Sequence, residues 1–171
     1  MKSFLIKWRN IDWLLFFAII ILLVLSISIL YSLSLNSDST NFLVVKKQII
    51  FSIVGLALFF LMSSINYSIW STYSKLIFVL FVIILLGVLF FGSEVRGTTG
   101  WIDLGFFSVQ PVEFAKIGLV IWLARYFSDH AGEFRNFKHI LISGFFTLVL
   151  VGLVMKQPDL GSALVLMGTW I

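Results

Sequence analysis

The sequence contains no cysteine, only two prolines and two histidines in 171 residues, and only 12% charged residues. The absence of cysteine excludes a disulfide framework and thiolate metal sites. The histidines, His130 and His139, lie in a polar stretch without the companion ligands of a metal site, so we interpret them as residues of a solvated loop. The net charge of +4 is small and gathers at the ends of apolar runs, which is not the pattern of a nucleic-acid-binding surface.

Apolar side chains are abundant instead. The sequence is 60% hydrophobic and has 19 phenylalanines, which is more than one soluble core of this size can bury. The sequence therefore predicts an integral membrane protein. The apolar run from Trp13 to Ser37, which follows three basic residues, is longer than the hydrophobic part of a signal peptide, so we interpret it as the first membrane span.

The apolar runs predict an all-α fold, a polytopic membrane helix bundle of about five complete spans and the start of a sixth. A helix needs about 20 residues to cross a bilayer. The expected spans cover about residues 11–35, 48–65, 76–91, 112–127 and 140–155, and the sixth begins at about residue 162. The last run is still apolar at Ile171, so we expect residues 1–171 to form a single transmembrane domain that is incomplete at its C-terminus.

Basic residues set the expected orientation, because they favour the cytoplasmic ends of spans. Seven fall on the side of the N-terminus and five on the other: Lys2, Lys7, Arg9, Lys75, Arg125, Arg135 and Lys138 against Lys46, Lys47, Arg96, Lys116 and Lys156. This distribution predicts a cytoplasmic N-terminus. The loop 92–111 and the turn 157–161 then both face outward, and the stretch 128–139 is a cytoplasmic connector.

The loop 92–111 contains four glycines and a tryptophan, Trp101. This composition suits an extracellular re-entrant or interfacial element with the tryptophan at the depth of the lipid headgroups. The alternative is a plain connecting loop anchored by that tryptophan. Arg96 and Asp103 belong to the same loop.

The fourth expected span opens with the residues "QPVEFAK" (110–116). Pro111 suits a first helical turn because it has no backbone N–H to satisfy. Glu113 then lies at the positive end of the helix dipole, and Lys116 lies on the same face one turn further. A lysine at that depth needs a carboxylate partner or an anionic ligand, and the candidate partners are Glu113 and Asp159.

Asp159 lies in "KQPDLGSALVL" (156–166), where a proline and a glycine interrupt the passage from the fifth span to the sixth. Ionisable residues at such helix breaks are typical of sites that line a membrane cavity. We therefore expect Glu113, Lys116 and Asp159 to converge on one outward-opening cavity, flanked by Gln110 and Lys156. The alternative is a structural cluster of ion pairs that fixes helix packing. Asp12, at the start of the first span, fits a helix N-terminal or interfacial role.

Two blocks of the sequence, "RGTTGWIDLGFFSVQPVEFAKIGLVIWLARYF" (96–127) and "KQPDLGSALVL" (156–166), resemble the SEDS family, the shape, elongation, division and sporulation proteins typified by RodA and FtsW. The "IDWLL" (11–15) and "KKQ" (46–48) stretches are also similar. The chain departs from the family pattern at Gly100, where members commonly have arginine, and at Val112, where they commonly have serine. The resemblance implies the N-terminal half of a protein of about ten transmembrane helices.

The resemblance further implies a peptidoglycan glycosyltransferase of the bacterial cytoplasmic membrane, which polymerises lipid II and works with a class B penicillin-binding protein. The family's main catalytic carboxylate is expected beyond residue 171, so this stretch is expected to be inactive alone. By motif match, Glu113, Lys116 and Asp159 would line the central cavity as supporting catalytic residues. Trp101 and Gln110 would lie at its mouth, and Arg96 would contact the substrate.

Polymerisation needs a base for the acceptor sugar hydroxyl and positive charge for the departing pyrophosphate. Lys116 can supply that charge, or a divalent cation, Mg²⁺ or Mn²⁺, held by carboxylates can do so. The residues alone also permit two other functions. One is a lipid flippase or transporter, which can likewise use broken helices, and the other is a non-enzymatic scaffold of the elongation or division machinery.

Overall fold

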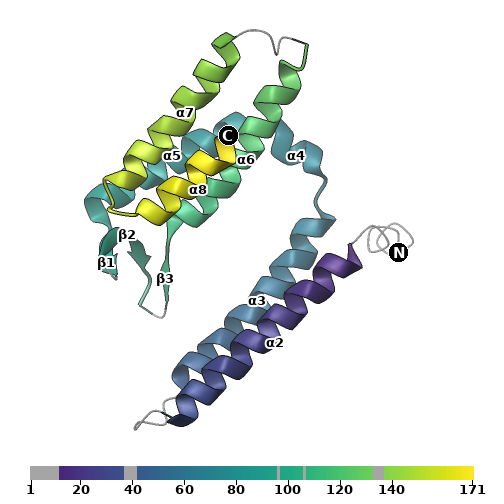
Figure 1. Cartoon of the computed structure of the whole chain (residues 1–171), viewed down its shortest axis with the longest axis vertical. Helices are drawn as coiled ribbons and strands as arrows, with labels where there is room; N and C mark the ends of the chain where they lie inside the picture. The colour runs from purple at the N-terminus through teal and green to yellow at the C-terminus, as the bar shows by residue number, and fades with distance from the viewer. Residues whose placement is uncertain (1–11, 37–41, 96, 106, 133–136) are drawn as a thin grey trace. The chain divides into compact units, whose positions relative to one another are not determined.

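The computed structural model describes residues 12–36, 42–95, 97–105, 107–132 and 137–171 (Figure 1). The chain divides into two compact units, residues 1–66 and 67–171. The described part is dominated by helices, as the composition predicted, and each unit is built around helices long enough to cross a membrane.

The described residues of the first unit form two helices, α2 (Trp13–Asn36) and α3 (Leu43–Ser64), which lie side by side (Figure 1). Phe16 of α2 packs against Phe59 and Phe60 of α3, with ring centroids 5.7 and 5.6 Å apart. Asp12 caps α2, because its Oδ1 accepts a hydrogen bond from the backbone N–H of Leu15 at 3.1 Å. The predicted role of Asp12 at the start of the first span is therefore confirmed.

Five helices pack together in the described part of the second unit. Its core includes four fully buried leucines from different helices, Leu85, Leu119, Leu150 and Leu166. The close approach of two helices depends on Gly118, because a Cβ atom there would lie 2.5 Å from the Phe81 ring. The helices are α4 (Tyr67–Thr72), α5 (Ser74–Phe91), α6 (Pro111–Asp129), α7 (Phe137–Met155) and α8 (Leu160–Trp170).

A small antiparallel sheet occupies the loop between α5 and α6. Its strands, β1 (Ser93–Val95), β2 (Thr98–Asp103) and β3 (Ser108–Val109), pair in the order β1-β2-β3. The composition of this loop predicted a re-entrant or interfacial element, and the strands were not predicted. The strands form because "TTGWID" is rich in β-branched and aromatic residues, and because Gly97 and Gly105, both at φ +82°, occupy the two connections.

The positions of the expected spans are confirmed to within a few residues, except that the second begins at Leu43 and not at residue 48. Lys46 and Lys47 lie inside α3, because a lysine stem can run along apolar surface while its ammonium reaches the membrane boundary. Among the described residues, α2, α3, α5 and α7 are long and apolar enough to cross a membrane.

Helix α6 has 19 residues but carries more charge than those four helices. It lies between α5 and α7 in the chain and packs against both in one bundle. Because α5 ends at the sheet and α7 begins at the opposite end of the bundle, α6 must run the full length between them. We therefore count α6 as a span on its position and α8, with 11 residues, as the start of the next.

The structure corrects the interpretation of the histidines as solvated loop residues. His139 lies in the first turn of α7 and His130 directly follows α6, and both are half-buried. Their rings lie 4.3 Å apart between centroids, and the Tyr126 hydroxyl is 3.0 Å from His139 Nδ1. The polar composition of this stretch predicted that both histidines face solvent. Contacts between aromatic rings at the two helix ends keep them half-buried instead. Residues 133–136 of that stretch lie outside the described residues.

Candidate functional site

The candidate site lies at the end of the second unit that carries the sheet, where α6 and α8 begin. Helix α6 starts at Pro111, as predicted. Gln110, the residue before it, has an extended backbone and does not use its side chain to cap α6. Its Nε2 instead donates a hydrogen bond to Asp159 Oδ2 at 2.8 Å, across 49 residues of sequence. The two helix breaks that the sequence singled out are thus joined directly.

Asp159 holds this junction with both carboxylate oxygens. Oδ2 accepts the bond from Gln110, and Oδ1 accepts a bond of 2.9 Å from the backbone N–H of Ser162, which makes Asp159 the N-cap of α8. The sequence predicted a carboxylate at this break but did not predict that it is a helix cap.

The lysine finds its partner on its own helix. Lys116 Nζ lies 2.8 Å from Glu113 Oε1, and the Lys116 side chain is 19% exposed while that of Glu113 is 58% exposed. Of the two candidate partners, the structure therefore selects Glu113. The backbone N–H of Glu113 donates to the carbonyl of Gln110 at 3.1 Å, so the ion pair begins one helical turn from the Gln110–Asp159 bond.

Trp101 lies on β2, which packs against both α5 and α6. The indole is half-buried, and its N–H donates to Thr98 Oγ1 at 2.9 Å. The carbonyl of Trp101 accepts a bond from Ser93 Oγ at 3.1 Å, which ties β2 to β1. The structure thus places Trp101 at the same end of the unit as the start of α6. Arg96, the predicted substrate-contacting residue, lies outside the described residues.

Gln157 is a structural residue of this site that sequence reasoning missed. Its side chain is 1% exposed, and its Nε2 donates to the carbonyl of Leu85 in α5 at 3.1 Å. Gly100 of β2 faces it, because a Cβ atom on Gly100 would lie 2.7 Å from Gln157 Oε1. The signal available in the sequence was an uncharged polar residue next to a proline at the end of an apolar run.

The expected divalent cation would need several oxygen or nitrogen ligands at one place. Within the part of the chain that the structure describes, no three histidine or acidic side chains come together as metal ligands. Glu113 is paired with Lys116, and both oxygens of Asp159 accept protein hydrogen bonds. The described residues of the site therefore form no ligand set for a metal on their own, and the divalent cation stays a prediction.

Comparison with known proteins gives this geometry a family context. The model of the FtsW, RodA and SpoVE family, described as cell cycle proteins, matches residues 9–171. The chain is 36% identical over 163 residues to a probable peptidoglycan glycosyltransferase FtsW of Haemophilus influenzae, a match that covers 92% of the chain and 40% of that protein. It is 33% identical over 158 residues to the peptidoglycan glycosyltransferase RodA of Treponema pallidum, a match that covers 90% of the chain and 36% of that protein.

A solved structure shares the fold. It comes from a study of the structural coordination of polymerization and crosslinking by a peptidoglycan synthase complex, and it matches with a TM-score of 0.76 and 31% identity. That match covers 95% of this chain and 46% of the other. The chain thus spans less than half the length of these relatives. From residue 9 to residue 171, sequence and fold agree, and the chain belongs to the FtsW, RodA and SpoVE family of cell cycle proteins.

Proposed function

We propose that the whole protein is a peptidoglycan glycosyltransferase that polymerises lipid II, in the bacterial cytoplasmic membrane with its N-terminus in the cytoplasm. Two relatives named as peptidoglycan glycosyltransferases support the glycosyltransferase activity, and the family resemblance supports lipid II as the substrate. The distribution of basic residues supports the orientation, which puts the start of α6 and of α8 at the outer face. The observation that carries the proposal is the half-exposed Lys116–Glu113 ion pair next to the Gln110–Asp159 bond.

The reaction forms one bond and breaks one. The hydroxyl oxygen of the acceptor sugar attacks the anomeric carbon of the donor, the bond from that carbon to the lipid pyrophosphate breaks, and a base takes the hydroxyl proton. The family resemblance assigns the base to a carboxylate beyond residue 171. The described residues then have the second task, which is to stabilise the negative charge that develops on the departing pyrophosphate.

Lys116 is suited to that task. Its ammonium is partly withdrawn from water, which strengthens its attraction for a phosphate, and Glu113 holds it in one place before the substrate arrives. Because Glu113 is the more exposed partner, an arriving pyrophosphate can share the ammonium without first separating a buried pair. We assign Lys116 the direct role and Glu113 the role of positioning it.

Gln110 and Asp159 support the Lys116–Glu113 ion pair. Their bond fixes the start of α6 against the start of α8, so the direction in which Lys116 projects depends on it. Both carboxylate oxygens of Asp159 are engaged in this structural role. We therefore assign Asp159 and Gln110 as positioning residues and not as groups that transfer protons. Trp101, at the same end, is proposed to contact the substrate at the mouth of the site.

The partner is proposed to be a class B penicillin-binding protein. A similar structure comes from work on a peptidoglycan synthase complex that coordinates polymerization with crosslinking. This supports a complex in which the present family member contributes the polymerase.

The proposal is tested with Lys116→Ala in the full-length protein, purified with its partner and supplied with lipid II in detergent. We expect loss of glycan polymer, about a hundredfold or more, because one charge that stabilises a transition state is removed. Lys47→Ala is the matched control, since Lys47 is an exposed lysine on the same predicted side and lies in the first unit. Membrane insertion and thermal unfolding should be unchanged in both variants.

Each outcome of this assay is informative about the function. Polymer formation by the unaltered protein in detergent separates a glycosyltransferase from a flippase, because translocation has no meaning without a bilayer. Full activity of Lys116→Ala would remove this lysine from the mechanism. No polymer from the unaltered protein, together with normal growth of cells that carry the variant, would favour a scaffold.

A further inference from the structure

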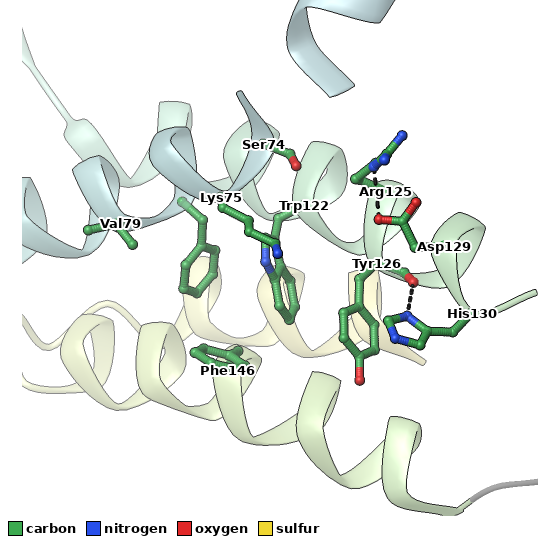
Figure 2. Close-up of a pocket in the computed structure, with 10 residues that line it drawn as sticks. Ser74, Lys75, Val79, Trp122, Arg125, Tyr126, Asp129, His130 and Phe146 are labelled. Atoms are coloured by element: carbon green, nitrogen blue, oxygen red, sulfur yellow. Dashed lines mark hydrogen bonds and ion pairs between the residues drawn. The ribbon is translucent and has the colours of Figure 1, made fainter. Parts of the chain in front are cut away.

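The second unit has a cavity at the end opposite to the candidate site, between the start of α5, the end of α6 and the first half of α7. Its volume is about 400 Å³. Figure 2 shows side chains that line it. The lining has an aromatic part, made by Phe78, Trp122, Tyr126 and Phe146, a polar part, made by Ser74, Lys75, Arg125, Asp129 and His130, and one aliphatic residue, Val79. The proposed function uses none of these residues.

The aromatic part forms a continuous wall. The Phe78 and Trp122 rings lie 5.0 Å apart between centroids, Trp122 and Phe146 5.1 Å, and Trp122 stacks on Tyr126 at 5.2 Å. Trp122 precedes the end of α6 at Asp129 by seven residues, which places it about 10 Å deeper along the helix axis. The cavity is therefore polar near the helix ends and apolar towards the middle of the bundle.

The charges of the polar part do not cancel. Arg125 Nε lies 2.9 Å from Asp129 Oδ2, so the charges of this arginine and this carboxylate cancel (Figure 2). Arg125 also donates a hydrogen bond to Ser71 Oγ at 3.2 Å. Lys75 is exposed and makes no ion pair with any described residue. The rim thus keeps one uncompensated positive charge.

We propose that this cavity binds an anionic phospholipid of the cytoplasmic leaflet. The phosphate lies against the Lys75 ammonium, and an acyl chain enters between Phe78, Trp122 and Phe146. Three observations agree on this occupant: the apolar depth of the cavity, a single net positive charge at its rim, and a position at the ends of membrane spans where headgroups lie. A zwitterionic headgroup suits the rim less well, because Asp129, the carboxylate that would hold its amine, is paired with Arg125.

The test uses the full-length protein in detergent, with native mass spectrometry to count retained lipid. Phosphatidylglycerol is the probe, phosphatidylethanolamine is the zwitterionic comparison, and inorganic phosphate is the competitor. We expect Lys75→Ala to weaken phosphatidylglycerol retention about tenfold, because one charge-assisted contact is lost. Lys75→Arg should restore it. Lys138→Ala is the matched control, since Lys138 is an exposed lysine at the same end of the bundle but does not line the cavity.

Val79→Trp tests the cavity itself with the charge left in place. Val79 lines the cavity and is 52% exposed, so a larger side chain can fill the space without entering the core. Retention should fall as in Lys75→Ala, with unfolding temperature unchanged, and Val79→Phe is the milder form of the same block. Lys116→Ala should retain the lipid while losing polymerisation, which separates this site from the proposed catalytic one.

Several results would overturn the proposal. Equal losses in Lys75→Ala and Lys138→Ala would mean general attraction to a basic surface. Equal retention of the two lipids would remove the role of the net charge, and displacement of phosphatidylglycerol by inorganic phosphate would mean a simple anion site. Undiminished retention in both Val79 variants would exclude the cavity as the binding place.

Discussion

The bond between Gln110 and Asp159 makes a quantitative prediction, because one carboxylate serves two partners whose contributions can be separated. Asp159→Ala removes the α8 cap, which is worth about 1 kcal/mol, and the interhelical bond to Gln110, for which about 1 kcal/mol is reasonable within a membrane bundle. The full-length protein should lose about 2 kcal/mol of folding stability. Asp159→Asn keeps one oxygen that can accept from the Ser162 N–H, and it puts an NH2 group in the place of Oδ2. The bond to Gln110 is then kept only if the Gln110 amide turns over, so that its oxygen accepts from this NH2. Because that turn keeps both bonds, the loss should stay below about 1 kcal/mol.

A double-mutant cycle with Gln110→Ala isolates the interhelical part. Unfolding of each single variant and of the double variant is followed in detergent by tryptophan fluorescence against denaturant. If the two side chains interact as the structure shows, the coupling energy should be about 1 kcal/mol. The cap contributes nothing to it, because the Ser162 N–H is unaffected by Gln110→Ala.

A coupling energy near zero would refute this reasoning, since it would mean that Gln110 and Asp159 act on stability independently. Equal losses for Asp159→Asn and Asp159→Ala would refute it differently, because the carboxylate charge would then matter and not the acceptor geometry. A positioning role also predicts that Asp159→Asn keeps most of the polymerase activity, whereas a role in proton transfer predicts that it loses nearly all.

Two glycine contacts give further predictions. Gly92→Ala should destabilise the protein by about 2–3 kcal/mol, because the new Cβ would collide with the backbone carbonyl oxygens of Thr99 and Val88. Gly55→Ala in α3 is the control, because the new Cβ there meets open space. It should be neutral or slightly stabilising in thermal unfolding. Gln157→Leu should cost about 1 kcal/mol in the same assay by removing the bond to Leu85, and an unchanged midpoint would show that this bond contributes nothing to stability. Gly100→Ala should cost a similar amount, about 1 kcal/mol, unless Gln157→Ala is present to relieve the contact.

Helix positions were readable from the sequence because apolar runs of sufficient length have one stable form in lipid, and Pro111 marked the start of α6. The sheet was not readable, because its strands are short and lie among glycines that equally suit an irregular loop. The sequence did not decide which of two carboxylates is the partner of Lys116, for a similar reason. Spacing along one helix made Glu113 reachable, but only tertiary packing decides whether Asp159 comes near enough to compete, and that packing gives Asp159 to Gln110.

The two polar contacts of the site differ in when they can form. Lys116 and Glu113 are three residues apart on one helix, so their ion pair exists as soon as α6 is helical and can enter the membrane already neutralised. The bond between Gln110 and Asp159 spans 49 residues and exists only after α8 has packed beside α6. The charged group proposed to meet the substrate is therefore paired locally during insertion, whereas its final direction is fixed only when the bundle closes. A variant that breaks the long-range bond should insert normally and still misplace the lysine, which is the behaviour expected of Asp159→Ala.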